Sequence, residues 1–366
     1  MTDKSIECGV FIPVGQGGWI ISSTSPETPA TYAYNKQVVQ QAESLGLDFA
    51  LSMAKWRGYG GVTGHWDVTL ESLTTMTALS ECTSTIKLWA TIHTMIFHPA
   101  ILAKMISTFD QASGGRAGIN LVGGSNPSDQ GQMGLWRNLD MDGRYELARE
   151  WIHVAKRLWS EDRVTHHGKF YDLEDCMSNP KPIQKPHPPI LCAATSDVGF
   201  KFVIEECDVA FMGAGDPERA LRAKRMAAEI GRPTQVYALM MMIPDETDAK
   251  AQARVDLYNS GVDLVAMENR TMEYAQDVPQ NSMVKRVAES SASGLAVNRN
   301  AMIGSEETIT ERLLELVETQ DLDGLVFTFA DFIEDMMFFG ERILPKLAKA
   351  GLRFPSYERL NASTAV

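Results

Sequence analysis

Short apolar runs alternate along the chain with longer segments in which apolar residues recur every three or four positions. Eight runs have few polar residues on either face, which is typical of strands buried in a parallel sheet. Between most of them, helical spacing and terminal Gly and Pro residues predict α-helices. The predicted strands are 7–14, 48–53, 86–92, 117–122, 189–194, 208–212, 235–242 and 324–329; the predicted helices are 34–45, 69–81, 99–109, 144–159, 217–230, 308–318, 333–350 and one each starting after 196 and near 248.

This alternation of strand and helix predicts an α/β fold. Each connection is long enough for a right-handed crossover, and eight such units close into a (β/α)8, or TIM, barrel. An open doubly wound sheet is the alternative, but no GxGxxG follows the first strand, so a dinucleotide-binding fold has little support. No repeat or boundary divides the chain, so we expect one domain over residues 1–366.

Three segments interrupt the alternation. Residues 269–300 are rich in Asn, Ser, Gln, Met and Glu and have little periodicity, which predicts a mobile lid inserted into the barrel. Residues 125–143 form a long predicted loop. Residues 162–179 are predicted to form a small excursion that turns at His166, His167 and Gly168.

Composition and charge restrict the possible functions. The 366 residues are 44% hydrophobic and 22% charged, which is ordinary for a globular protein. The net charge of −13, with no basic cluster, argues against nucleic acid or a membrane surface as partner. The five cysteines show no CxxC spacing, so neither a disulfide framework nor a structural zinc site is expected. Without a signal-peptide pattern or a membrane-length apolar run, we expect a cytoplasmic protein.

The clearest candidate site lies at the end of the predicted strand 117–122. Asn120 is the polar residue of this otherwise apolar strand, and Gly123 and Gly124 follow, where backbone can approach a ligand closely. In α/β proteins ligands bind at the carboxyl ends of strands. A solvated Asn at a strand corner is an equally good interpretation of the pattern alone. The other polar residues near predicted strand ends are Lys55, Arg57, Thr91, His93 and Ser196.

No metal site and no catalytic nucleophile are expected. His166 and His167 are adjacent and would point to opposite sides of an extended chain, while His93 and His98 lack a carboxylate at ligand spacing. There is no GxSxG motif, and none of the cysteines lies in an electropositive loop.

Anion binding has better support. Arg144 and Tyr145 are predicted to open one helix and Ser196 another, and free N–H groups at a helix start favour a phosphate. Each residue alone also fits an ordinary structural role.

Six segments together carry a resemblance to a known family. They read AESLGLDFALSMAKWRGYGG (42–61), LWAT (88–91), HPAILAKMISTFDQASGGRAGINLVGG (98–124), QMGLW (132–136), GRYELAREW (143–151) and MIGSEETITERL (302–313). This combination resembles the bacterial luciferase-like family of flavin-dependent monooxygenases and covers nearly the whole chain. The resemblance implies a (β/α)8 barrel that receives reduced FMN from a separate NAD(P)H-dependent flavin reductase. It further implies that O2 is used to cleave a C–N or amide bond of a small pyrimidine-like or pyridine-like heterocycle, in a homodimer or homotetramer.

The resemblance also assigns site residues. The family's catalytic pocket falls on Leu51, Thr91 and Asn120, an apolar wall with one hydroxyl and one amide that would shield flavin and O2 from water. Without the resemblance, Thr91 would be read as a packed β-branched strand residue. The family's FMN contacts fall on Ala54, Lys55, Asn120, Asp129, Arg144, Tyr145 and Ser196, where Asp129 is a shorter carboxylate than the family's Glu.

Several positions depart from the pyrimidine-cleaving members on the substrate side: His98, Ser125, and Gly64 with His65 ahead of Trp66. We hypothesise that His65, Trp66 or His98 contacts a different small heterocycle or amide. The alternative for His98 is that it caps the helix that starts at Pro99.

Three further functions remain open from the sequence. One is a monooxygenase of organosulfur or sulfonate compounds, for which Arg57 is the candidate anion contact. The second is a non-catalytic flavin-binding or light-emitting protein. The third is a deazaflavin-dependent dehydrogenase of the same superfamily.

Overall fold

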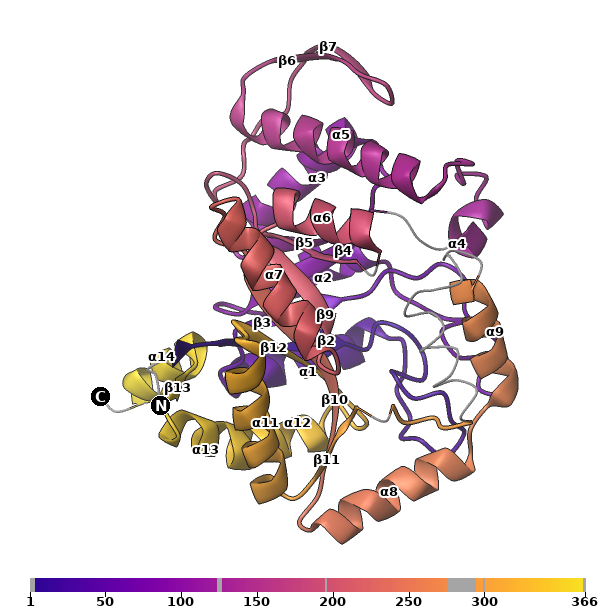
Figure 1. Cartoon of the computed structure of the whole chain (residues 1–366), viewed down its shortest axis with the longest axis vertical. Coiled ribbons are helices and arrows are strands. Elements are labelled where there is room, and N and C mark those ends of the chain that lie inside the picture. The colour runs from indigo at the N-terminus through magenta and orange to yellow at the C-terminus, as the bar shows by residue number, and fades with distance from the viewer. Residues whose placement is uncertain (1–3, 124–126, 195, 276–293, 299, 365–366) are drawn as a thin grey trace.

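Eight parallel strands close into a barrel in the computed structural model, which describes residues 4–123, 127–194, 196–275, 294–298 and 300–364 (Figure 1). Each strand pairs with the next around the barrel, and the last strand pairs with the first, so that the sheet is closed. The order is β2 (Glu7–Ile12), β3 (Phe49–Ser52), β4 (Lys87–His93), β5 (Ala117–Val122), β8 (Ile190–Ala193), β9 (Val209–Gly213), β10 (Gln235–Pro244) and β12 (Gly324–Phe329). The predicted (β/α)8 barrel is confirmed, and closure rules out the open sheet.

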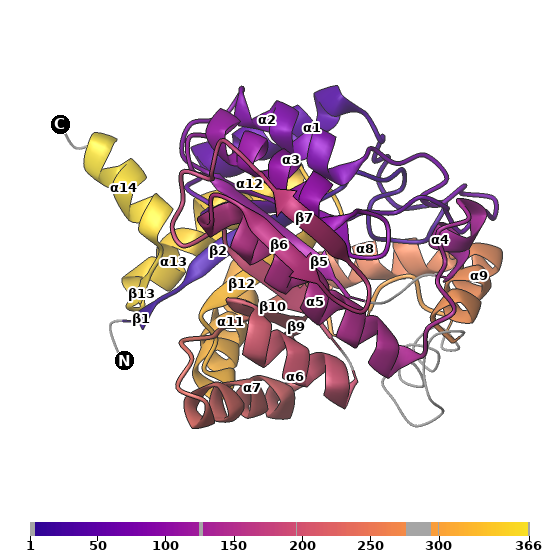
Figure 2. The same ribbon diagram turned by 90° about the horizontal axis from the view of Figure 1, so that it is seen from above.

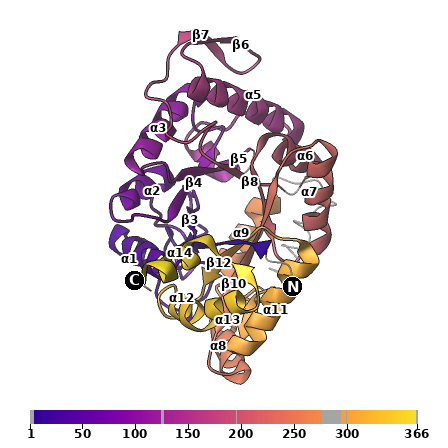
Figure 3. The ribbon, with the colours of Figure 1, turned by 90° about the vertical axis from the view of Figure 1, so that its left-hand side faces the viewer.

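Helices form the outer ring of the barrel, as the view from the end that carries both termini shows (Figure 3). Most begin at a side chain that accepts a backbone N–H bond, as Ser305 does from Thr308. They are α1 (Tyr32–Ser44), α2 (Ser72–Ser80), α3 (Pro99–Ala112), α5 (Met141–Ser160), α6 (Asp197–Glu206), α7 (Pro217–Glu229), α8 (Asp248–Ser260), α11 (Glu306–Gln320), α12 (Glu334–Phe338) and α13 (Leu344–Lys349), the last two joined by the π-helical turn η1 (Phe339–Ile343).

Several boundaries differ from the predicted ones. The predicted loop 125–143 contains α4 (Pro127–Gln132), and α5 begins at Met141, so Arg144 and Tyr145 lie inside its first turns rather than opening it. Asp140 caps α5 by accepting from the N–H of Gly143 at 2.9 Å. The predicted lid 269–300 starts within α9 (Leu264–Ala275), and its residues 276–293 and 299 lie outside the described part.

Short elements that the sequence did not predict complete the fold. They are β11 (Met302–Gly304), which extends the sheet beside β10, the pair β1 (Lys4–Ser5) and β13 (Leu352–Arg353), and α14 (Pro355–Thr364). The excursion 162–179 is an antiparallel hairpin of β6 (Val164–His167) and β7 (Asp172–Cys176). His166 and His167 end β6 and precede the turn; they contact Glu150 and Asp172, and no metal-binding group of three residues occurs in the described chain.

Three stacked rings fill the amino end of the barrel. Phe49 lies 5.3 Å from Trp89 and 5.5 Å from Tyr237 between ring centroids. Glycines on neighbouring strands leave room for the three rings: Gly9, Gly118 and Gly324. All three rings are almost inaccessible to solvent, so they close the amino end of the barrel.

Replacing Gly9 with alanine should destabilise the protein by about 1–3 kcal/mol, because the added Cβ would lie 2.3 Å from the ring of Phe49 in a filled core. Thermal unfolding measures the effect. Gly131→Ala is the control, since nothing lies within 4 Å of a Cβ built there. Equal melting temperatures for the two variants would contradict this packing.

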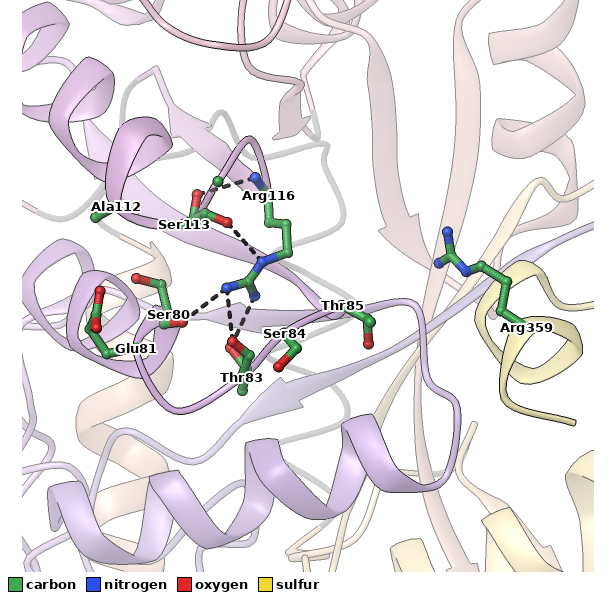
Figure 4. A pocket seen from close by; sticks show the side chains of 10 residues that line it. Ser80, Glu81, Thr83, Ser84, Thr85, Ala112, Ser113, Arg116 and Arg359 are labelled. Carbon is green, nitrogen blue, oxygen red and sulfur yellow. Dashed lines mark hydrogen bonds between the residues drawn. The ribbon is translucent and has the colours of Figure 1, made fainter. Parts of the chain in front are cut away.

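An open hollow of about 620 Å³ also lies at the amino end, between the loops before β4 and β5 and helix α14 (Figure 4). The Arg116 side chain lies along its wall and donates all of its N–H groups to the surrounding loops. Two of the acceptors are the carbonyls of Ile86 at 2.8 Å and Ser80 at 2.9 Å. Residues at this end of a barrel serve stability. Arg116 is thus a structural tie, and we look for the site at the other end.

The described helices include none that combines the length and the apolar character needed to cross a membrane.

Candidate active site

The carboxyl rim of the barrel lies away from both termini, on the side where α4 and α9 lie together (Figures 1 and 2). The loop after β3 is bonded to both helices there. The N–H of Arg57 donates to Asp129 Oδ1 of α4 at 2.8 Å, and Asn269 of α9 donates to the carbonyl of Tyr59 at 2.8 Å. Three segments remote in sequence thus form one rim, which carries most of the predicted site residues.

Thr91 and Asn120 face each other inside this end of the barrel. They are partners in the register of β4 and β5, and Asn120 Nδ2 donates to Thr91 Oγ1 at 3.0 Å. The Thr91 hydroxyl in turn donates to the backbone carbonyl of Ser52, so its orientation is fixed. Asn120 Oδ1 is buried and accepts no hydrogen bond from any described residue. Thr91 and Asn120 form one wall with Leu51 of β3, which is fully buried. This wall is uncharged, and Asn120 Oδ1 is its one hydrogen-bond acceptor without a partner among the described residues.

A buried ion cluster lies at the start of the β3–α2 loop. Lys55 Nζ is 2.6 Å from Glu273 Oε1 and 3.2 Å from Asp129 Oδ1. The exposed fractions of these side chains are 3% for Lys55, 8% for Glu273 and 0% for Asp129. Buried charges persist in proteins when they are paired. Asp129 Oδ1 thus lies within ion-pair distance of Lys55, while its Oδ2 is buried without a donor among the described residues.

Glu273 was missed from the sequence. It lies on α9, within the stretch assigned to the lid, and no spacing marks it as a partner of a lysine 218 positions away. Only the barrel brings the two together.

Tyr145 and Ser196 come together at a second point of the rim. Ser196 caps α6, its Oγ accepting from the N–H of Gly199 at 3.2 Å. A Cβ built on Gly199 would lie 2.2 Å from Tyr145 Oη, and one built on Gly123 would lie 3.1 Å from the Tyr145 ring. The two glycines therefore admit the tyrosine between the end of β5 and the start of α6.

Arg144, the other predicted anion contact, is buried, and its guanidinium lies 5.4 Å from the ring of Trp136. Ala54 immediately precedes the ion cluster and is partly buried.

Comparison with known proteins decides the family. The family model for luciferase-like monooxygenases matches residues 6–322. The chain belongs to this family. The pyrimidine monooxygenase RutA of Stutzerimonas stutzeri is 38% identical over 348 residues, covering 93% of this chain and 96% of that protein. RutA of Acinetobacter baylyi is 36% identical over 349 residues, covering 93% and 94%. Both the family and the predicted class of enzyme, a flavin-dependent monooxygenase, are confirmed.

A solved structure supports the luciferase-like fold. Riboflavin lyase RcaE, crystallised with modified FMN and riboflavin, superposes with a TM-score of 0.86 at 20% sequence identity, covering 98% of this chain and 96% of that one. At this identity the likeness concerns the fold alone.

His65 and Trp66 lie in the β3–α2 loop of this luciferase-like barrel. The His65 ring stacks on Trp66, with 5.0 Å between centroids, and the Trp66 indole donates to the carbonyl of Gly18 at 2.7 Å. Burial, together with the smaller effect of the nearby Arg270 guanidinium, lowers the pKa of His65 to about 3 against the opposing effect of Asp263. His65 is therefore neutral at neutral pH.

The neutral state of His65 predicts acid sensitivity. Because its folded-state pKa lies below the unfolded value of about 6.5, its stability contribution is complete above pH 6.5 and is lost as the pH falls toward 3. The loss should approach roughly 1.4 kcal/mol per pH unit in that window. Chemical denaturation of wild type and His65→Gln between pH 7 and 4 measures it. Parallel pH profiles would contradict the assignment.

His98 caps α3. Its Nδ1 accepts from the N–H of Ala100 at 3.2 Å, and its ring meets Tyr171 of the hairpin edge-on, at 5.3 Å between centroids. This is the capping arrangement that the sequence offered as the alternative to substrate contact. Ser125, the other departure, lies outside the described residues.

Replacing His98 with alanine should cost about 1 kcal/mol of stability through the lost cap and leave kcat/KM within twofold. His98→Asn, which keeps a capping acceptor, should recover the stability. A drop in kcat/KM in both variants with unchanged stability would return His98 to the substrate site.

Arg57 and His93 are the remaining polar residues that were predicted near strand ends. Arg57 is exposed and serves the rim through its backbone N–H. His93 is buried, and burial lowers its pKa against the opposing effect of Asp129.

Proposed function

We propose that this chain is a two-component monooxygenase that takes reduced FMN from a separate flavin reductase and uses O2 to cleave a C–N or amide bond of a small, pyrimidine-like heterocycle. The observation that carries the proposal is the Thr91–Asn120 pair, set in an apolar wall at the carboxyl rim. A homodimer or homotetramer remains a prediction.

The residues at the rim fit FMN. Tyr145 Oη and the first N–H groups of α6, capped by Ser196, would hold the phosphate, since a helix start favours an anion. Asn120 Oδ1 and Asp129 Oδ2 are buried acceptors without donors among the described residues, which suits a ligand whose ring and ribityl chain carry N–H and O–H groups. When bound, reduced FMN supplies the electrons that activate O2, chemistry that no side chain provides.

The side chains around Thr91 position and protect the reaction. The hydroxyl of Thr91 is held by the Ser52 carbonyl, and it fixes the Asn120 amide from the other side. The Thr91 proton is committed to Ser52, so the role of Thr91 is to hold the Asn120 amide in one orientation before a ligand binds, which is preorganisation. Leu51 keeps water from that wall, so reduced flavin and O2 would meet in a dry environment.

The substrate class is supported by the two relatives named as pyrimidine monooxygenases at 36% and 38% identity. The sulfonate alternative stays a prediction, with the exposed side chain of Arg57 as its candidate anion contact. The neutral His65 and the ring of Trp66 remain proposed substrate contacts.

The experiment is product analysis with labelled oxygen. The chain, a flavin reductase, NADH, FMN and ¹⁸O2 are incubated with uracil, thymine and 2-pyridone, and products are identified by mass spectrometry. We expect one ¹⁸O atom in a ring-opened or amide-cleaved product, only when the reductase is present. NADH consumption with no labelled product from any of these rings would contradict the proposal.

A further inference from the structure

A continuous row of aromatic rings runs from β9 past β2 to the β3–α2 loop. Phe211 of β9 lies 6.1 Å from Phe11 of β2, and Phe11 lies 4.4 Å from Trp19 in the loop that follows. Trp19 meets Trp66 edge-on at 5.4 Å. Two more rings of the β3–α2 loop continue the row beyond Trp66, so that the aromatic strip consists of Phe211, Phe11, Trp19, Trp66, Tyr59 and His65.

The backbone around the strip is shaped to hold it. Trp66 has a φ of 60°, a left-handed conformation that is costly for a bulky side chain and that concentrates at functional sites. The loop after β2 leaves space for the rings: a Cβ on Gly15 would lie 2.7 Å from the Trp66 ring, and one on Gly17 would lie 2.8 Å from His65 Nδ1. Two loops therefore interlock to hold the Trp66 and His65 rings.

The strip still reaches solvent, unlike the rings at the closed end. Phe11 and Phe211 are each 7% exposed and Trp66 is 9% exposed, and Trp19 is only partly buried. Phe49 and Tyr237 at the amino end are 0% exposed. The strip is thus less enclosed than the rings at the amino end of the barrel.

The strip lies next to the residues proposed to bind the flavin, in the order of the strands around the barrel. Tyr145 and Ser196 lie beyond β5 and β8, the Thr91–Asn120 pair lies on β4 and β5, and Trp19 and Trp66 follow β2 and β3. A flavin held by its phosphate at the first point and by its ring at the second would therefore have the strip next in order along the rim.

The strip carries no charge. His65 is neutral near pH 7, because burial keeps its pKa low. The nearest ammonium group, Lys55 Nζ, lies 4.9 Å from the centre of the Tyr59 ring, but it is already paired with Glu273 and Asp129. Arg270 approaches from α9 and donates to Met267 Sδ at 3.4 Å. A ligand on these rings would gain stacking, and the rings themselves offer it no charge.

We propose that the aromatic strip is the stacking surface for the substrate and selects flat, uncharged nitrogen heterocycles, with Trp19 as its central contact. This inference rests on the proposed function for the place of the flavin. It extends the proposed contacts at His65 and Trp66 into one binding surface with Phe11, Trp19 and Phe211, which no family motif supplied, and adds a selection rule against charged rings.

The test compares Trp19→Ala, Trp19→Phe and the control Trp56→Ala, whose exposed indole lies in the same loop as Trp66 but outside the strip. For each protein, FMN affinity is measured by fluorescence, and uracil, thymine and orotate (uracil bearing a carboxylate) are titrated calorimetrically with FMN present and absent. Steady-state kinetics with the flavin reductase give KM and kcat, and circular dichroism checks folding.

We expect Trp19→Ala to raise the KM and Kd for uracil or thymine at least tenfold, Trp19→Phe to raise them threefold or less, and Trp56→Ala to leave them unchanged. FMN affinity should stay within twofold throughout, and orotate should bind wild type at least tenfold more weakly than uracil. Unchanged uracil and thymine affinity in Trp19→Ala, equal binding of orotate, or no binding of any uncharged ring to wild type would overturn the proposal. Failure of wild type to bind FMN would instead contradict the proposed function. The titrations without FMN distinguish this outcome, because they measure binding of the rings to the strip alone.

Discussion

Replacing Asn120 with alanine should lower kcat/KM by a factor of about 100 or more, the usual effect of removing one preorganised group from a reacting centre. Asn120 is bonded to Thr91 across β4 and β5 and presents the wall's unused acceptor, so alanine removes both. FMN affinity should fall by about tenfold at most, the value of one hydrogen bond. Stopped-flow and steady-state kinetics with the flavin reductase, together with FMN titration, separate the two effects.

Thr91→Ser and Thr91→Val are the matched controls for this pair. Serine keeps the hydroxyl that bonds to the Ser52 carbonyl, while valine keeps the shape and loses the hydroxyl. We expect serine to retain most of the turnover and valine to lose about as much as Asn120→Ala. If Asn120→Ala and Thr91→Val both turned over like wild type, the pair would have only a packing role.

Replacing Lys55 with methionine should be the most destabilising change at the rim, costing about 3–5 kcal/mol, because it strands two buried carboxylates. Lys55 is bonded to Glu273 and lies beside Asp129, and all three side chains are nearly inaccessible. Chemical denaturation gives the loss in the free energy of unfolding, and FMN titration gives any accompanying loss of affinity.

Two variants make that result interpretable. Lys250→Met breaks an exposed ion pair with Glu246 and should cost less than about 1 kcal/mol. Adding Glu273→Gln to Lys55→Met removes one stranded charge and should restore part of the lost stability. Additive losses in the double variant would show that Lys55 and Glu273 do not act as a pair.

The barrel could be predicted from the sequence because its strands are buried on both faces. The strands Ala117–Val122 and Gly324–Phe329 match the predicted ranges to the residue. The short helix α4 escaped prediction because its sequence, PSDQGQ, has no apolar periodicity. The two-residue strands β1 and β13 are recognisable only through their pairing with each other.

From the sequence, candidate site residues could be named only where a local pattern or a family motif marks them. Asn120 interrupts an apolar strand and Ser196 marks a helix start, whereas Thr91 was singled out through the family resemblance. Glu273 and the strip residues Phe11, Trp19 and Phe211 carry no such signal, because their partners are brought together by closure of the barrel. Phe11 and Phe211, for example, meet across 200 positions of sequence, and neither ring is unusual in its own strand.

The central claim is that the carboxyl rim binds FMN with its phosphate between Tyr145 and Ser196 and its ring against Thr91 and Asn120. A crystal structure of the chain with FMN tests this directly. We expect the phosphate within hydrogen-bonding distance of Tyr145 Oη and the start of α6, and the ring in contact with the Asn120 amide. A flavin bound elsewhere, or bound at the rim with Thr91 and Asn120 out of contact with its ring, would contradict the account.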